Sequence, residues 1–340
     1  MLINRRQFLT SLGLSILAVQ MPTLTAQSKL SPNTIIKPPR LRIGDTVGLI
    51  APAGIVDDED IAAAQRSVSG LGLKVKLGAH ILDRYGYLAG KDVDRAEDLN
   101  AMFSDRAVNA IIAMRGGWGC NRILPLLDYT SIRSHPKILM GYSDITSLLL
   151  AINARSRLIT FHGPVATSTW NQLTTDYLQR ILFNGEAVTM QNLNIGDVQV
   201  ELIAPGKARG KLVGGNLSVL SAMVGSPYLP SWNKSILFVE EISEDVYRVD
   251  RMLTQLKNAG ILNQIAGFIF GQCTNCASGD EPNFTLMQVL QEHIIPLGIP
   301  AWYGSMIGHI KDKFTVPVGA EVEINANAGT IQMLDAAVNS

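Results

Sequence analysis

Along the first half of the chain, apolar runs that read as strands alternate with segments of helical periodicity. The strand-like runs cover residues 46–53, 74–82, 108–114, 138–140 and 158–164, and the helical segments cover 58–71, 92–103, 120–127 and 145–152. Strands that alternate with helices across short loops form a parallel sheet with right-handed crossovers. The pattern therefore predicts an α/β, doubly wound domain over residues 40–167, with candidate sites at the carboxyl ends of its strands.

The second half of the chain has a different pattern. Residues 168–205 lose the alternation and read as a connecting segment with some helix at 175–183. A second domain, 206–336, is richer in strands: apolar runs at 236–239, 265–270 and 301–303 read as strands, and 246–259 and 286–293 read as helices. Alternation with period two at 315–324 and 329–333 predicts a hairpin on an antiparallel sheet.

The first residues predict an export signal. Arg5 and Arg6 precede Phe8-Leu9, a mild apolar stretch covers residues 12–19, and a polar stretch leads to Ala26. This is typical of a twin-arginine-type signal peptide over residues 1–26. The apolar part is shorter than the ~20 residues that a membrane-spanning helix needs. We therefore expect a chain exported to the periplasm without stable membrane insertion after cleavage; the alternatives are an uncleaved anchor or a basic end that arose by chance.

Composition removes several classes of partner and cofactor. The 340 residues carry 29 basic and 29 acidic side chains, which argues against a nucleic-acid partner because no excess of positive charge exists. Cys273 and Cys276 have the spacing of half a zinc knuckle, but no second CxxC pair and no histidine pair at metal-ligand spacing occurs, so we expect no structural zinc. No cofactor is expected. Whether these two cysteines form a local disulfide or remain free thiols is open.

One short connection stands out as a candidate for chemistry. Only Gly141-Tyr-Ser-Asp144 separates the strand at 138–140 from the helix at 145–152. A serine at so tight a strand-to-helix turn is exposed at the carboxyl edge of the sheet, beside the first amides of the helix. Ser143 therefore resembles the serine of a nucleophile elbow, although Ile145 replaces the glycine expected two residues later. Alternatively, Ser143 or Asp144 simply caps the helix.

A serine nucleophile needs a base and an acid that orients the base. Of the five histidines, His162 after an apolar run and His309 in a glycine-rich loop after a strand fit best, whereas His293 reads as a surface residue. For the acid, Glu240 and Glu241 follow the apolar run 236–239 directly and should point to opposite faces of a strand. The alternative is that both acids flank the helix that follows.

A glycine-rich loop follows the strand at 108–114. Arg115-Gly-Gly-Trp-Gly119 is too short for a phosphate-binding P-loop and does not match the dinucleotide fingerprint. Paired glycines at a strand end allow close backbone approach to a ligand, and Gly116 or Gly117 can supply one donor of an oxyanion hole with the Asp144 amide as the other. The alternative is a tight turn with Trp118 in the core.

Taken together, these motifs resemble one known family, over about residues 41–334. The matching segments occur in the same order as in the LD-carboxypeptidases, serine peptidases that include muramoyltetrapeptide carboxypeptidase and the microcin C self-immunity peptidases. They are Arg115-Gly-Gly-Trp-Gly-Cys, Gly141-Tyr-Ser-Asp-Ile-Thr, His162-Gly-Pro, Gly214-Gly-Asn-Leu, Leu237-Phe-Val-Glu-Glu, Tyr247-Arg-Val-Asp-Arg-Met-Leu and Gly304-Ser-Met-Ile-Gly-His.

The resemblance implies a role for each candidate residue. Ser143 matches the nucleophile, Glu240 the acid and His309 the base, while the amides of Asp144 and of one of the two loop glycines match the oxyanion hole. It also implies a Rossmann-like amino-terminal domain, a smaller β-rich carboxy-terminal domain, a site in the cleft between them, no metal, and a homodimer. Well-known recycling members are cytoplasmic, so the export signal is a departure from the family.

The function implied is removal of the terminal D-Ala from peptidoglycan tetrapeptides (muropeptides) by acyl transfer, with Arg115 as a candidate for binding the free carboxylate. Two alternatives stay open at this point. The substrate can instead be a peptidyl-nucleotide antibiotic, as for the self-immunity relatives. Alternatively, the chain is an exported two-domain ligand-binding protein, which would not need Ser143, Glu240 and His309 together.

Overall fold

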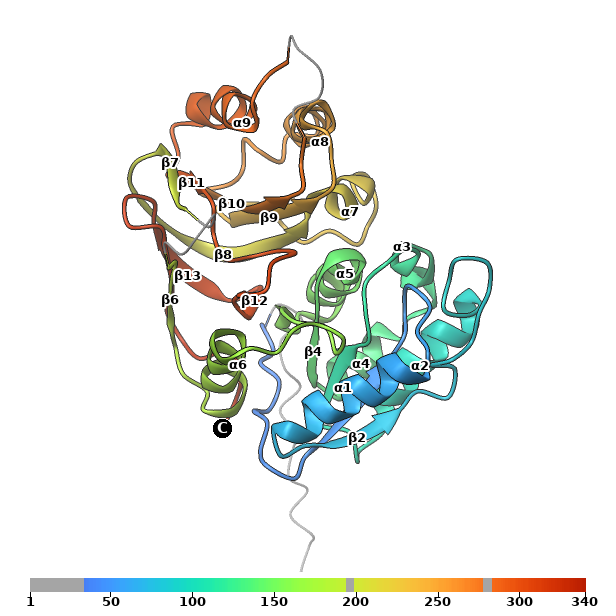
Figure 1. Cartoon of the computed structure of the whole chain (residues 1–340). Coiled ribbons are helices and arrows are strands. Elements are labelled where there is room, and N and C mark those ends of the chain that lie inside the picture. The colour runs from blue at the N-terminus through green and yellow to red at the C-terminus, as the bar shows by residue number, and fades with distance from the viewer. Residues whose placement is uncertain (1–33, 194–198, 278–282) are drawn as a thin grey trace, which may run out of the picture. The chain divides into compact units, whose positions relative to one another are not determined.

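A computed structural model describes residues 34–193, 199–277 and 283–340, and from Ile35 onward the chain forms one compact unit. Two sheets dominate this unit, one of six strands and one of eight (Figure 1). The expected signal peptide at residues 1–26 lies outside the described residues, so export remains a prediction. No helix within the described ranges is both long enough and apolar enough to cross a membrane.

The first sheet is the predicted doubly wound one. Its strands run in the order β12-β5-β4-β3-β1-β2; β1 to β5 are parallel to one another, and β12 pairs antiparallel with β5. The chain order reverses between β1 and β3, and a ligand site is expected where the carboxyl ends of these strands separate. The strands are β1 (Thr46–Ile50), β2 (Lys74–Leu77), β3 (Ala110–Ala113), β4 (Ile138–Gly141) and β5 (Thr160–His162).

The helices of this half follow the predicted positions closely. Asp57 caps the first helix by accepting from the Asp60 amide, and the Asp60 side chain accepts from the Asp57 amide in return. One segment, 120–127, is helical only to Ile123 and continues as a tighter turn that contains Pro125, which has no amide to donate. The helices are α1 (Asp58–Gly70), α2 (Asp92–Ser104), α3 (Cys120–Ile123), α4 (Tyr129–Ser134) and α5 (Thr146–Ser156).

Helix α5 has no polar face, because both sheets pack against it. It contacts β4 and β5 of the first sheet and β8 of the second, and its residues 146–153 are all buried. A helix without a polar face is a buried helix. The serine turn that precedes α5 is therefore anchored in the interior of the protein.

The second sheet has the order β6-β14-β13-β8-β9-β10-β11-β7. Its centre, β8 to β11, is parallel, and its outer strands are antiparallel. The strands are β6 (Thr189–Gln191), β7 (Glu201–Ala204), β8 (Lys207–Asn216), β9 (Ile236–Ile242), β10 (Gly267–Thr274), β11 (Ala301–Tyr303), β13 (Glu321–Asn325) and β14 (Thr330–Met333). The remaining helices are α6 (Gln172–Leu178), α7 (Leu217–Ala222), α8 (Val246–Asn258) and α9 (Leu286–Ile294).

The expected hairpin near the carboxyl end is only partly right. β13 and β14 pair antiparallel as predicted, but residues 315–324 are not one strand. Their first part, β12 (Val316–Val318), pairs with β5 and forms the edge of the first sheet, where Pro317 is tolerated. At Gly319 (φ 94°) the chain turns toward the second sheet, and a Cβ there would lie 2.1 Å from the Asn153 side chain.

The state of the paired cysteines is settled within the described residues. Cys273, near the end of β10, and Cys276 form a disulfide, while the buried Cys120 is a free thiol. Of the two alternatives that the sequence left open, the local disulfide is the one observed.

Candidate active site

The serine turn has the backbone of a strained elbow. β4 ends at Gly141, Tyr142 is extended, and Ser143 has φ of +63°. A left-handed conformation costs a residue with a Cβ about 1–2 kcal/mol. A Cβ on Gly141 would lie 2.8 Å from the Ile145 side chain, so the missing Cβ is what lets Ile145 pack where an elbow usually has a second glycine. Such strain marks a candidate functional residue.

The capping alternative is wrong for both residues of the turn. Neither Ser143 nor Asp144 provides a side-chain cap to α5. The buried Asp144 carboxylate instead accepts a hydrogen bond of 2.8 Å from the Cys120 amide at the start of α3. Burial raises the pKa of Asp144, an effect that this hydrogen bond opposes. Asp144 thereby joins the serine turn to the end of the glycine-rich loop.

The glycine-rich loop lies directly against the serine. A Cβ on Gly116 would lie 2.9 Å from the Ser143 hydroxyl oxygen and 3.5 Å from the Asp144 amide nitrogen. The Gly116 carbonyl accepts from the Gly54 amide at 3.2 Å, which joins the loops after β1 and β3 at the point where the strand order reverses. Trp118 is 62% exposed, so the alternative that it belongs to the core is wrong.

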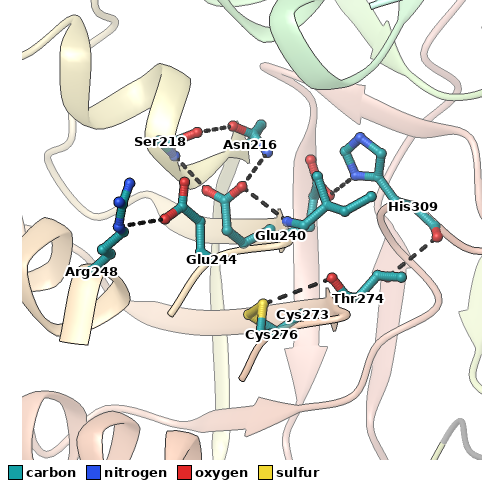
Figure 2. The surroundings of a disulfide bond; sticks show 11 residues. Asn216, Ser218, Glu240, Glu244, Arg248, Cys273, Thr274, Cys276 and His309 are labelled. Carbon is teal, nitrogen blue, oxygen red and sulfur yellow. Dashed lines mark hydrogen bonds and ion pairs between the residues drawn. A yellow bond between two sulfur atoms is a disulfide. The ribbon is translucent and has the colours of Figure 1, made fainter. Parts of the chain in front are cut away.

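The acid and the expected base meet in the second half of the chain. Glu240 of β9 is fully buried, and its Oε2 lies 2.8 Å from Nδ1 of His309. A Cβ on Gly308 would lie 3.0 Å from the same oxygen, so a glycine there allows the loop to approach. The Thr274 hydroxyl donates to the His309 carbonyl at 3.2 Å. Figure 2 shows the imidazole directed at the carboxylate and Thr274 supporting the loop from the side of the disulfide.

The pKa values of the two adjacent carboxyl groups, Glu240 and Glu241, are shifted in opposite directions. Burial tends to raise the pKa of Glu240, but the imidazoles of His162 and His309 outweigh it and hold the pKa below its ordinary value. Burial raises the pKa of Glu241, which accepts hydrogen bonds from the amides of Ser218 and Ile242 and from the Asn216 side chain. Only one of the pair lines the cleft, as predicted, but it is Glu241. Glu240 instead contacts His309, which lines the cleft. Glu241 supports the start of α7 instead of α8.

A cleft of about 680 Å³ brings the candidates from both halves together. It is lined by Ser143 and Asp144 from the elbow, by the glycine-rich loop, and by His309 from the second half. Among the described residues the Ser143 hydroxyl makes no hydrogen bond, and catalytic hydrogen bonds often tighten only when substrate is bound. The loop contributes Arg115, Gly116, Gly117 and Trp118, and the other lining residues are Asn121, Thr167, Asn216, Ser218, Val219, Ala222, Glu241, Ile242 and Glu244.

Family models match both halves of the chain. The LD-carboxypeptidase N-terminal domain matches residues 47–163, and the LD-carboxypeptidase C-terminal domain matches residues 209–324. These ranges carry the elbow, Glu240 and His309, and together they exceed half of the sequence. The chain belongs to the LD-carboxypeptidase family. The family and the class of enzyme predicted from the sequence motifs are thereby confirmed.

Individual LD-carboxypeptidase relatives agree with this assignment. A protein of Bacillus subtilis (strain 168) named probable murein peptide carboxypeptidase is 40% identical over 295 residues, which are 85% of this chain and 91% of that protein. The microcin C7 self-immunity protein MccF of Escherichia coli is 26% identical over 87% of this chain and 94% of its own length. The crystal structure of muramoyltetrapeptide carboxypeptidase from Oxalobacter formigenes is 29% identical, with a TM-score of 0.75 over 85% of this chain and 97% of that one.

The remaining histidines of this family member lie outside the wall of the cleft. His162, the other candidate base, is 2% exposed and does not line the cleft. The interpretation of His293 as a surface residue is wrong: it is 9% exposed, and its Nε2 lies 2.6 Å from Asp250. His80 pairs with Asp83 at 2.9 Å, and His135 bonds to the Ser131 carbonyl within its own helix end.

Sequence reasoning missed several residues around Glu240, His309 and the serine turn. Thr274 donates a hydrogen bond to the His309 carbonyl, and Gly308 leaves room for the loop to pack against Glu240. The Lys313 ammonium lies 4.2 Å from the centre of the Tyr142 ring. Only Gly308, one residue before the histidine, carried a local signal. The other two contacts join segments far apart in the sequence, and no spacing rule points to them.

Proposed function

We propose that this protein is a peptidoglycan carboxypeptidase that removes the terminal D-Ala from tetrapeptides by acyl transfer to Ser143. The observation that carries the proposal is a strained serine and a carboxylate-bound histidine that line one cleft. The names of two relatives, a probable murein peptide carboxypeptidase and a muramoyltetrapeptide carboxypeptidase, support the substrate class.

Glu240 fixes which nitrogen of His309 acts as the base. Because the carboxylate accepts from Nδ1, that nitrogen carries the proton and Nε2 keeps a free lone pair. In the proposed reaction Nε2 removes the Ser143 proton, and the alkoxide attacks the carbonyl that precedes the terminal D-Ala. His309 then protonates the departing amine, and water hydrolyses the resulting ester in a second step.

The oxyanion of the tetrahedral intermediate needs donors beside the serine. The Asp144 amide at the start of the turn and the amide of Gly116 or Gly117 are the proposed pair, since the glycine loop packs against Ser143 without a side chain between them. One donor of this kind is typically worth about 3 kcal/mol in the transition state.

A carboxypeptidase must also bind a free terminal carboxylate. Arg115 is exposed, lines the cleft, and is oriented by a hydrogen bond of 3.3 Å from its guanidinium to the Ile55 carbonyl. A guanidinium offers two parallel donors to a carboxylate. Arg115 is therefore the proposed recognition residue for the terminal carboxylate of the substrate.

The proposed compartment is the periplasm. The twin-arginine pattern before residue 26 supports export, and the Cys273–Cys276 disulfide is of a kind that persists in oxidising compartments. The homodimer that the family resemblance implies is proposed as well, and analytical ultracentrifugation of the mature chain would test it.

Release of D-Ala from a purified disaccharide tetrapeptide tests the function. We expect the wild-type chain to release D-Ala and Ser143→Ala to lose at least about 10³-fold in kcat/KM, with a free energy of unfolding within about 1 kcal/mol of the wild type. An active Ser143→Ala variant would rule out this serine as the nucleophile.

The second candidate substrate is a peptidyl-nucleotide, and the similarity to MccF is what favours it. Offering aspartyl sulfamoyl adenosine in the same assay separates the two: cleavage of it without release of D-Ala would replace the wall substrate. Binding of either compound with no turnover at any pH would favour the third reading, an exported ligand-binding protein.

A further inference from the structure

The acid of the proposed triad has a second oxygen that the triad does not use. Oε2 of Glu240 bonds to His309, but Oε1 is fully buried and has no hydrogen-bond partner in the part of the chain that the structure describes. Buried polar atoms without partners are costly, and each one needs an explanation. The imidazole of His162 is close to this oxygen: its Nε2 lies 3.9 Å away and is itself buried and unpartnered.

The backbone of His162 is fixed on both sides. It is the last residue of β5, and it pairs with Gly141 of β4 and with Val316 of β12. Its ring packs edge-on against Phe238, with centroids 5.4 Å apart, and against Tyr142 at 6.1 Å. These two ring contacts and the strand pairing hold the imidazole where its Nε2 lies 3.9 Å from Oε1 of Glu240.

The charges around Glu240 favour its ionised form. Its pKa is held below the ordinary range by the two imidazoles, against the effect of burial. Lys313 is also close enough to interact with Glu240, although burial lowers the pKa of this lysine to about 8. The titratable groups that face the carboxylate are therefore His309, His162, Lys313, Tyr142 and Glu241.

We propose that His162 is a positioning residue, which donates Nε2–H to Oε1 of Glu240 and thereby holds Oε2 on Nδ1 of His309. Shortening the 3.9 Å separation by about 1 Å gives an ordinary N–H···O hydrogen bond. Since His162 belongs to the first sheet and Glu240 to the second, the bond also fixes the acid relative to the half that carries Ser143. This inference rests on the proposed triad but not on the identity of the substrate.

A direct catalytic role for His162 does not fit its surroundings. The ring is 2% exposed and is absent from the wall of the cleft, so no substrate atom reaches it. Its influence on the reaction passes through the carboxylate. A carboxylate that loses one of two donors becomes a stronger acceptor for the other, so it should hold the protonated form of His309 to higher pH.

The test compares His162→Leu, which removes the donor, with His162→Gln, whose side-chain amide can replace Nε2–H. We expect His162→Leu to lower kcat on the order of 10- to 100-fold, with KM little changed. Losses of this size are common when the hydrogen-bond partner of a metal-binding side chain is removed, which is a comparable positioning role. We also expect the acid limb of its kcat/KM profile to move to higher pH. His162→Gln should recover most of kcat and return the limb toward its wild-type position.

Two controls keep the outcome interpretable. His293→Leu removes another buried histidine, one bonded to Asp250 outside the cleft, and should leave the pH profile in place. The rate at which a fluorophosphonate probe labels Ser143 measures activation of the serine without any peptide, so it should fall in His162→Leu even if tetrapeptides are not the substrate. A wild type that labels but releases no D-Ala would refute the proposed function and leave this inference intact.

An unchanged kcat, labelling rate and acid limb in folded His162→Leu would overturn the proposal. If that variant does not fold, His162→Asn takes its place, because its amide is too short to reach the carboxylate. The inference then predicts that His162→Asn loses activity relative to His162→Gln, and equal activity of the two would overturn it.

Discussion

The elbow and the acid–base arm, which we define as Glu240 with His309 and its loop, are built in opposite ways. The elbow is made of consecutive residues, 138–146, and its special feature is a strained backbone at Ser143. The arm joins residues 69 positions apart through one hydrogen bond of 2.8 Å, with the carboxylate fully buried. One half of the site is therefore local in the sequence, and the other exists only in the folded chain.

This difference indicates whether substitutions in each half of the site should change stability or catalysis. Contacts with neighbouring residues hold the strained conformation of the elbow. Gly141 leaves room for the Ile145 side chain, Asp144 accepts from the Cys120 amide, and α5 packs between the two sheets. The arm depends on charges and on loop contacts, such as that of Thr274 to the His309 carbonyl. Substitutions in the arm should therefore change chemistry more than stability, and substitutions of the elbow serine to glycine should change both.

The largest effect is expected in the arm. Glu240→Gln keeps the shape of the side chain but offers an amide to His309, which favours the tautomer with the proton on Nε2 and removes the base. We expect kcat to fall by about 10³- to 10⁴-fold, as for loss of the acid in other serine triads. Steady-state kinetics of D-Ala release measures this loss.

Asp250→Asn is the matched control, because it makes the same kind of change beside His293, which lies away from the cleft. It should keep kcat within about twofold of the wild type. A Glu240→Gln variant with more than a tenth of wild-type kcat would show that the carboxylate does not orient the base.

An intermediate effect is expected at the disulfide beside the arm. The turn that it closes is bonded to the chain after Glu240, through the Ser243 amide to the Thr274 carbonyl at 2.8 Å and the Val246 amide to the Ala277 carbonyl at 3.0 Å. Replacing Cys273 and Cys276 by serine together should lower the free energy of unfolding by about 2 kcal/mol, the loop-entropy value for so short a loop.

Urea unfolding of the double variant measures this change, and reduction of the wild type with dithiothreitol should reproduce it. Cys120→Ser serves as the control for loss of a thiol outside the turn, and reductant should not alter its difference from the wild type. An unfolding midpoint that reductant does not move would show that the turn needs no covalent closure.

The smallest effect on stability is expected in the elbow. Ser143→Gly relieves the left-handed strain but adds freedom to the unfolded chain, so we expect a gain in stability of about 1 kcal/mol or less together with loss of activity. Thermal unfolding followed by circular dichroism measures the gain.

Ser67→Gly, within α1, is the control because the same replacement there lacks any strain to relieve. It should lower stability by about 0.5 kcal/mol. If both glycine variants lose stability equally, the backbone of the elbow is not strained in solution.

Much of the fold could be predicted because its signals are local. Buried runs such as 138–140 and 236–239, the helix starts near Asp58 and Asp92, and the tight turn before α5 follow from periodicity and capping alone. The crossing of residues 316–318 into the first sheet could not be predicted in this way. Strand alternation sets which face is buried but does not say which sheet a strand joins.

The candidate site likewise has a part that local sequence predicts and a part that depends on contacts between distant segments. The sequence by itself determined the elbow, the glycine loop and the order of the motifs, because each is a short segment whose backbone conformation depends on its own residues. The family resemblance implied the pairing of Glu240 with His309, and the structure shows the contact. Only the tertiary structure decided that Cys273 and Cys276 are joined and that His162 lies near the other carboxylate oxygen. These are contacts between distant segments, and their free energy comes from burial and charge at a meeting point that exists only after the two sheets have packed together.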